Sequence, residues 1–156
     1  LDSRAAGALQ SMLDDMRSQG LSPLVCSSYR AHGEQERLFQ NQVEGWLEEG
    51  FTQEEAEEKA ALLVARPGTS EHELGLSADI VAESNQLLDE SQEHTAEQQW
   101  MLKHCQEYGF ILRYPTGKTG LTGVEYEPWH YRYVGREAAQ EIMAQGLCLE
   151  EYLVQR

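Results

Sequence analysis

The sequence predicts an α+β fold in which a central, mostly antiparallel sheet is flanked by helices. Three observations predict this class. Amphipathic helices come first, strands mixed with helices follow them, and the connections are too irregular for a repeating βαβ unit. Neither an internal repeat nor a linker divides the 156 residues, so we expect one domain that spans residues 1–156.

The first half of the chain is expected to be largely helical. Apolar residues at positions 9–16 recur at helical spacing, and Gly20 ends that helix. Residues 24–29 predict a short strand. A second amphipathic helix follows over residues 35–49, and the pair Thr52–Glu55 forms a capping box that opens a third helix.

The second half carries the remaining strands. Residues 76–81 predict a strand, and a capping box over residues 95–98 opens a helix that Gly109 ends. Residues 110–113 predict another strand. A glycine-rich connection then leads to a last strand at about residues 124–134, and two short helices close the chain.

Composition excludes several classes of partner. The chain has 12 Lys and Arg against 27 Asp and Glu, which gives a net charge of -15. Such a surface repels nucleic acid and anionic lipid, so we expect neither as a partner. The acidic runs at 48–49 and 54–58 predict a solvated helix face, because the spacing of an acidic calcium loop is missing. No apolar run approaches the roughly 20 residues that span a bilayer, so we expect no membrane-spanning segment.

Neither the cysteines nor the first residues of the chain indicate a cell compartment. Cys26 and Cys105 lie in apolar patterns, so we expect buried free thiols and no disulfide. Cys148 is the third, and three cysteines cannot all pair with one another. The first residues lack the basic and apolar regions of a signal peptide.

Three distant segments carry a candidate metal site. His72, Asp79 and His130 supply two imidazoles and one carboxylate, which leaves the fourth position of a tetrahedral zinc open for water. Glu127, three residues before His130, is a candidate base for that water. The alternative is that the two histidines are unrelated surface or core residues, but the joint pattern favours a site. The other histidines are expected on the surface or in helix packing: His32, His94 and His104.

The geometry of this candidate site depends on two local features. His72 precedes a glycine, in a segment that is free to fold back toward Asp79 in the next strand. Pro128 favours an extended backbone at Glu127. In a flat strand Glu127 and His130 would face opposite sides, so the chain must bend or bulge there, or the glutamate must reach round.

These segments resemble those of a known family. The run SEHELGLSAD at residues 70–79 resembles the S-x-H-x-x-G-x-A-x-D signature of the M15 zinc peptidases, and EPWH at 127–130 resembles their E-x-W-H motif. The run SSYR at 27–30, with Gln35 five residues on, resembles their upstream S-x-Y-R segment. The similarity runs from about residue 23 to 135 and is to the VanY-like D-alanyl-D-alanine carboxypeptidase branch, which includes L,D-carboxypeptidases. Ser77 departs from the pattern, which has alanine there.

The resemblance implies a Hedgehog/DD-peptidase-like fold and one Zn²⁺ per chain on His72, Asp79 and His130. It also implies that Glu127 is the catalytic base. Trp129 is expected to pack beneath the site and not to touch substrate.

The resemblance implies substrate contacts as well. Arg30 would stabilise the oxyanion of the scissile carbonyl, a role that suits a guanidinium. Gln35 and Ser70 would help to hold the peptide terminus. Simpler readings stay open: Arg30 as a surface salt-bridge residue, Gln35 as an ordinary first-turn helix residue, and Ser70 as the cap of a turn.

The activity that this resemblance implies is removal of the C-terminal D-alanine from peptidoglycan stem peptides, by attack of a zinc-activated hydroxide. The alternative within the same chemistry is an L,D-carboxypeptidase that trims tetrapeptide stems. Less favoured are an endopeptidase, a D,D-dipeptidase and a non-catalytic zinc-containing module that binds cell wall. The expected partner is the stem peptide, the expected state is a monomer, and the expected location is the outer face of the cell envelope, reached through a preceding N-terminal signal or anchor.

Overall fold

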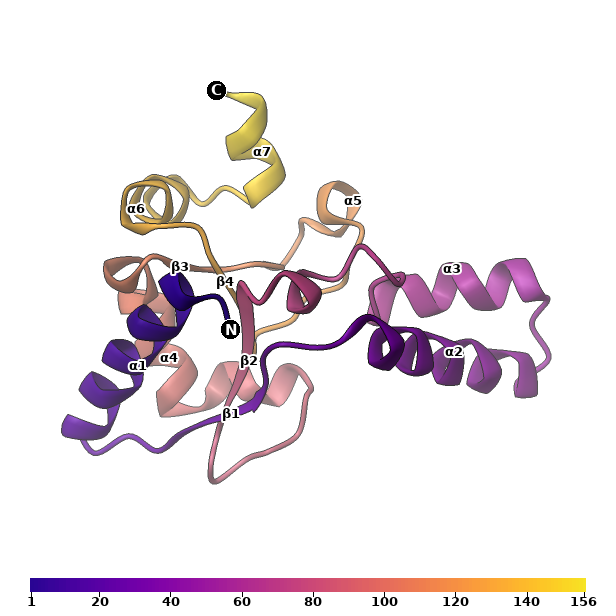
Figure 1. The fold of residues 1–156 in the computed structure, drawn as a ribbon, viewed down its shortest axis with the longest axis horizontal. Coiled ribbons are helices and arrows are strands. Elements are labelled where there is room, and N and C mark those ends of the chain that lie inside the picture. Colours follow the sequence, from indigo (N-terminus) through magenta and orange to yellow (C-terminus); the bar gives the residue numbers. More distant parts are fainter.

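A computed structural model describes all 156 residues and confirms the α+β class. Its sheet contains four strands in the order β1-β2-β4-β3, and each neighbouring pair is antiparallel (Figure 1). The strands are β1 (Pro23–Ser27), β2 (Ser77–Ala82), β3 (Phe110–Leu112) and β4 (His130–Tyr133).

Seven α-helices and three 3₁₀ turns surround the sheet. The helices are α1 (Ser3–Ser18), α2 (His32–Glu48), α3 (Gln53–Leu63), α4 (Ala96–His104), α5 (Thr119–Thr122), α6 (Arg136–Gln145) and α7 (Leu149–Val154). The 3₁₀ turns are η1 (Glu71–Leu74), η2 (Glu90–His94) and η3 (Cys105–Tyr108). The capping box expected at Thr52 and Glu55 is present.

Strand alternation gives the sheet a core face and a polar face. Ala78 and Ile80 of β2 and Tyr131 of β4 belong to the main core, which α1 and α4 complete. Since successive side chains of a strand point to opposite faces, Asp79 and His130 lie on the other face. That second face also carries a smaller core, in which β3 packs against α6 and α7 through Ile111, Ala139, Ile142 and Tyr152.

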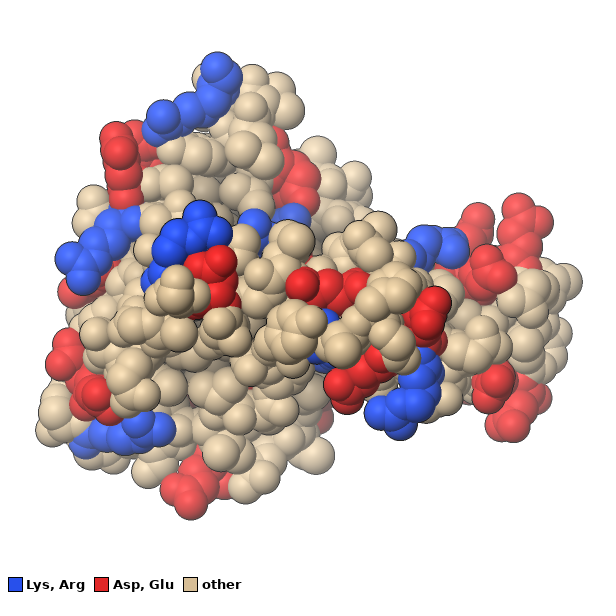
Figure 2. All heavy atoms as spheres, in the orientation of Figure 1, with Lys and Arg blue, Asp and Glu red and all other residues tan.

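Helices α2 and α3 form an arm that projects from the rest of the molecule (Figure 1). The arm has an apolar cluster of its own, made by Phe39, Val43, Ala56 and Ala60. Its acidic side chains lie outside this cluster, and Figure 2 shows acidic groups along the arm and at its tip. The acidic runs of the sequence therefore form a largely solvated face, as expected.

The prediction of a strand over residues 124–134 is wrong for most of its length. Only His130–Tyr133 pairs in the sheet. The backbone turns at 127–130, where the His130 N–H donates to the Glu127 carbonyl at 3.1 Å. The bond pairs the backbone N–H of His130 with the backbone carbonyl of Glu127 inside the turn. Pro128 suits the second position of such a turn because the proline ring fixes φ.

The expectation for Cys26 is also wrong, because this residue is exposed. It lies on the edge strand β1, where the register shifts between Val25 and Ser27, and its thiol contacts the Asp79 carbonyl at 3.4 Å. All three cysteines are free, and Cys105 and Cys148 are buried. No helix combines the length and the apolar character needed to cross a bilayer.

Ser77 leads to a first testable prediction. The residue is fully buried in β2, and its hydroxyl has no hydrogen-bond partner. Burial of an unpaired hydroxyl costs roughly 1–3 kcal/mol, so Ser77→Ala is expected to raise the free energy of unfolding by about 1 kcal/mol in urea titrations. The matched control is Ser91→Ala, which removes a hydroxyl that accepts from Asn85 Nδ2 at 2.7 Å. A loss of stability in Ser77→Ala larger than in the control would contradict this reading.

Candidate active site

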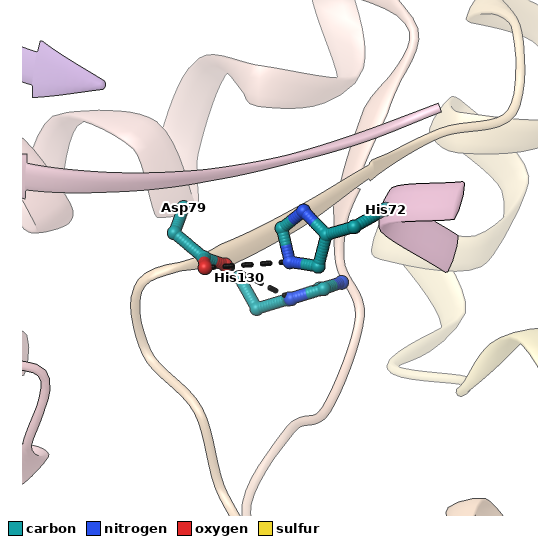
Figure 3. A group of neighbouring side chains, drawn as sticks. All are labelled: His72, Asp79 and His130. Atoms are coloured by element: carbon teal, nitrogen blue, oxygen red, sulfur yellow. Dashed lines mark ion pairs between the residues drawn. The ribbon is translucent and has the colours of Figure 1, made fainter. Parts of the chain in front are cut away.

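The fold brings the three predicted metal ligands together on the polar face of the sheet. Asp79 of β2 and His130 of β4 are directly opposite each other in the antiparallel register. His72 enters from the turn η1, and Figure 3 shows both imidazoles directed at the Asp79 carboxylate. One ligand atom from each residue lies within 4.8 Å of the other two, and all three residues are buried.

The orientation of His72 is fixed from outside the site. Its Nδ1 lies 2.6 Å from the Ser28 carbonyl, so Nδ1 carries the proton and Nε2 is left facing Asp79 Oδ2 at 3.3 Å. The turn that delivers His72 ends at Gly75, whose φ is +67° and where a Cβ would lie 2.9 Å from the Asp2 nitrogen. A glycine is therefore required there on two counts.

The donor atoms at the centre fit a cation. Asp79 Oδ1 lies 3.0 Å from His130 Nδ1, yet it is buried and has no aligned hydrogen bond. The two imidazole rings lie edge to face with centroids 4.9 Å apart. A carboxylate that faces two imidazole nitrogens and has one oxygen without a hydrogen bond is what a shared metal ion would satisfy.

The charge balance of the site also favours a cation. Burial acts to raise the pKa of Asp79, but the imidazoles of His130 and His72 hold that pKa well below its ordinary value. Burial acts to lower the pKa of His130, but Asp79 and Glu71 raise it to about 10. Buried carboxylates thus stabilise positive charge at this point, and a divalent ion held by His72, Asp79 and His130 would supply it.

Glu127 reaches the centre because of the turn at Pro128. Its Oε2 lies 3.5 Å from His130 Nδ1, on the same side as Asp79. The bend that the sequence required is therefore a tight turn. Burial raises the pKa of Glu127 to about 7, while the positive charges of His130 and Arg30 oppose this rise.

Arg30 is held beside this centre by a small network. Its Nη1 donates to Gln35 Oε1 at 2.7 Å, its Nη2 donates to Ser27 Oγ at 3.0 Å, and its backbone N–H donates to the His72 carbonyl at 3.1 Å. Gln35 is fully buried, and its Nε2 donates to the Ala65 carbonyl at 2.6 Å. Both ends of the Gln35 amide are therefore engaged within the protein.

Ser70 and Trp129 lie next to the ligands in the chain. Ser70 is buried at the N-terminus of η1, and its side chain does not cap that turn. Trp129 is half-buried, and its carbonyl accepts from the Ile80 N–H at 2.9 Å. The other histidines lie away from the site and pair with glutamates: His32 with Glu73, His94 with Glu93, and His104 with Glu107.

Sequence reasoning missed a group of residues behind His130. Glu71 lies 3.6 Å from its Nε2, and Arg113 and Arg132 pair with Glu71. Tyr114 packs against the same imidazole, with ring centroids 4.9 Å apart. The one available signal was an arginine directly after an apolar strand in a chain with only 12 basic residues.

Comparison with known proteins agrees with this geometry. A family model described as "VanY: D-alanyl-D-alanine carboxypeptidase" matches residues 1–136. A D-alanyl-D-alanine carboxypeptidase of Enterococcus faecalis is 43% identical over 98% of this chain and 55% of its own length. The chain thus spans about half the length of the curated relatives that it matches.

Solved structures give the same result. VanYB in complex with D-alanine-D-alanine superposes with a TM-score of 0.89 at 42% identity, covering 100% of this chain and 83% of that one. A VanY variant in complex with Zn(II) gives 0.85 at 43% identity, over 98% and 83%. The L,D-carboxypeptidase LdcB gives 0.85 at 40% identity, over 97% and 67%. With more than half of its length matched by the family model, the chain belongs to the VanY family of D-alanyl-D-alanine carboxypeptidases.

Proposed function

We propose that this protein is a zinc-dependent carboxypeptidase that removes the C-terminal D-alanine from peptidoglycan stem peptides. The observation that carries the proposal is the position of Glu127, a largely buried carboxylate with a pKa of about 7, beside three convergent ligands. A structural zinc site has no need of such a base. The Zn(II) bound by a VanY relative supports the choice of metal.

His72 Nε2, His130 Nδ1 and a carboxylate oxygen of Asp79 would hold the ion, one per chain. Two imidazoles and one carboxylate are a ligand set typical of catalytic zinc, with a position left for water or substrate. When bound, the ion supplies Lewis-acid activation of water and of the scissile carbonyl.

Glu127 is assigned the proton transfers. It accepts a proton from the attacking water and then donates it to the nitrogen of the departing D-alanine. Efficient acid and base catalysis requires a pKa near the working pH, and the pKa of about 7 at Glu127 suits both steps. The turn at Pro128 places this carboxylate beside the ligand set, with its Oε2 3.5 Å from His130 Nδ1.

Arg30 is assigned to the negative charge that develops on the scissile carbonyl oxygen. A guanidinium fixed in advance by Gln35 and Ser27 stabilises that charge without reorganisation. We propose that Gln35 acts through Arg30, since its amide is already engaged. Ser70, next to ligand turn η1, is assigned to the peptide terminus.

The substrate assignment follows the family, whose members include a VanYB complex with D-alanine-D-alanine. An L,D-carboxypeptidase acting on tetrapeptide stems is the second candidate, favoured by the similarity to LdcB. A non-catalytic wall-binding module would not need Glu127 and Arg30, and both are present.

The proposed setting is the outer face of the cell envelope, where peptidoglycan stems are found. One chain supplies every residue of the site, so we propose that the monomer is active. The acidic surface, with a net charge of -15, argues against nucleic acid as a partner.

A product analysis separates these candidates. We expect the zinc-loaded protein to shorten a stem pentapeptide ending in D-Ala-D-Ala by one alanine residue, and to leave the tetrapeptide intact, when the products are weighed by mass spectrometry. Loss of alanine from the tetrapeptide alone would identify the L,D-carboxypeptidase instead. Binding of either peptide without cleavage would identify the non-catalytic module, and a parallel reaction with a chelator controls for contaminating metal-independent peptidases.

A further inference from the structure

A chain of ion pairs, buried at Glu71 and Arg113 and partly exposed at Glu150, links the candidate ligand His130 to helix α7. Glu71 Oε1 accepts from Arg113 Nε at 2.7 Å and forms an ion pair with Arg132 Nη1 at 2.9 Å. Arg113 then uses its two terminal nitrogens on Glu150 of α7, with Nη1–Oε2 at 3.0 Å and Nη2–Oε1 at 2.5 Å. Two arginines and two glutamates give this network no net charge, so each charge is compensated inside it.

The outward ring nitrogen of His130 faces this network. While Nδ1 is directed at Asp79, Nε2 lies 3.6 Å from Glu71 Oε2. Both Nε2 and Glu71 Oε2 are buried, and neither has a hydrogen-bond partner. A buried donor and a buried acceptor that face each other are stabilised when they bond to one another.

Metal binding would fix which ring nitrogen of His130 carries the proton, and therefore whether Nε2 can donate to Glu71. A neutral imidazole offers a lone pair on one nitrogen and carries its proton on the other. If Nδ1 of His130 binds the metal, the proton lies on Nε2, and Glu71 Oε2 is the facing acceptor. A carboxylate that accepts from the second nitrogen of a metal-binding histidine fixes its tautomer and raises its basicity as a ligand.

We propose that Glu71 is a positioning residue that accepts the Nε2–H of His130 and so holds Nδ1 toward the metal, and that Glu150 of α7 keeps Glu71 in place through Arg113. The inference rests on the proposed zinc site and deepens it. Tyr114 supports the arrangement, because its ring lies 4.9 Å from the His130 ring and 4.8 Å from the Arg113 guanidinium.

Through Glu150, the C-terminal helix α7 is linked to the metal site. The family match ends at residue 136, whereas Glu150 lies in α7, over residues 149–154. The side chain of Glu150 is one-third exposed, and that of Arg113 is nearly fully buried. An outer carboxylate on α7 thus reaches the metal site through one buried guanidinium.

The test compares zinc affinity in three variants. Glu71→Gln keeps the shape of the side chain but removes its charge, and Glu150→Gln releases Arg113 while leaving Glu71 intact. Glu151→Gln is the matched control, because Glu151 is the next residue of α7 and pairs with Lys118 at 2.8 Å, away from Glu71. Zinc affinity is measured by competition with a chelating dye, and thermal unfolding of the metal-free proteins reports on the fold.

We expect Glu71→Gln to weaken zinc binding roughly 10- to 100-fold, in line with the loss of an outer partner of a ligand histidine. Glu150→Gln is expected to weaken it by a smaller factor, roughly three- to tenfold, since it acts through Arg113. Glu151→Gln is expected to bind zinc like the parent. In nitrogen-15 NMR of the zinc-loaded parent, the His130 Nε2–H should be protected from solvent exchange, and this protection should fall in Glu71→Gln and Glu150→Gln.

Parent-like zinc affinity and parent-like exchange in both network variants would overturn the inference. If Glu71→Gln does not fold, the comparison of Glu150→Gln with Glu151→Gln decides alone: a loss confined to Glu150→Gln supports the network, and equal affinities overturn it. Failure of the parent itself to bind zinc would instead overturn the proposed function.

Discussion

Replacement of Glu127 by glutamine is expected to lower kcat on the stem peptide roughly 10²- to 10⁴-fold, the usual contribution of a positioned acid and base. The amide is nearly the same size as the carboxylate but cannot accept the proton of the attacking water. Because Glu127 is 3.5 Å from His130 Nδ1 and is assigned no place among the ligands, the variant should still bind one zinc per chain. Steady-state kinetics and metal analysis of the same preparation check both parts.

The matched control for this prediction is Glu125→Gln. Glu125 lies two residues earlier in the same segment and is exposed, so this variant should keep parent-like turnover. If the Glu127→Gln protein had a parent-like kcat, the assignment of Glu127 as the base would be wrong. A variant that also lost its zinc would move Glu127 from the role of base to that of ligand.

Replacement of Asp79 by asparagine should have the second large effect, on metal binding itself. Asp79 is the one negatively charged ligand of the set and contacts both imidazoles, at 3.3 Å and 3.0 Å. A neutral amide oxygen is a weaker ligand, so zinc affinity should fall by at least about 100-fold, beyond the range expected for an outer partner. Activity at limiting zinc should fall with it, and excess zinc should restore part of it.

Competition with a chelating dye measures the affinity of Asp79→Asn. The control is His104→Asn, which alters a histidine that pairs with Glu107 outside the site. If Asp79→Asn bound zinc as tightly as the parent, Asp79 would not be a zinc ligand and the predicted three-residue site would be wrong.

Much of this fold could be predicted because its periodicity is local. The apolar spacing in α1 and the capping box at Thr52 specify helices without reference to distant residues. The strand β2 could be predicted equally well, since it is a short apolar run that closely follows a glycine. The three ligands could be predicted because each lies in a short motif: His72 and Asp79 are seven residues apart, and His130 follows Glu127 by three residues.

What could not be predicted depends on tertiary structure or on competition between two local structures. Pro128 is compatible with an extended strand or with a turn, and the 3.1 Å bond between His130 and Glu127 selects the turn. The exposure of Cys26 follows from a register shift against β2, which no periodicity reveals. The partners of Arg113 lie 42 and 37 residues away, at Glu71 and Glu150, so their pairing emerges only in the folded chain.

The central claim is that one zinc ion at His72, Asp79 and His130 makes this chain a carboxypeptidase. The most direct measurement is a zinc titration of chelator-treated protein, with release of D-alanine from a stem pentapeptide recorded at each point. We predict no activity without metal, a linear rise with added zinc, and a plateau at one equivalent per chain. Full activity in the chelated protein, or no activity at one equivalent of bound zinc, would contradict the claim.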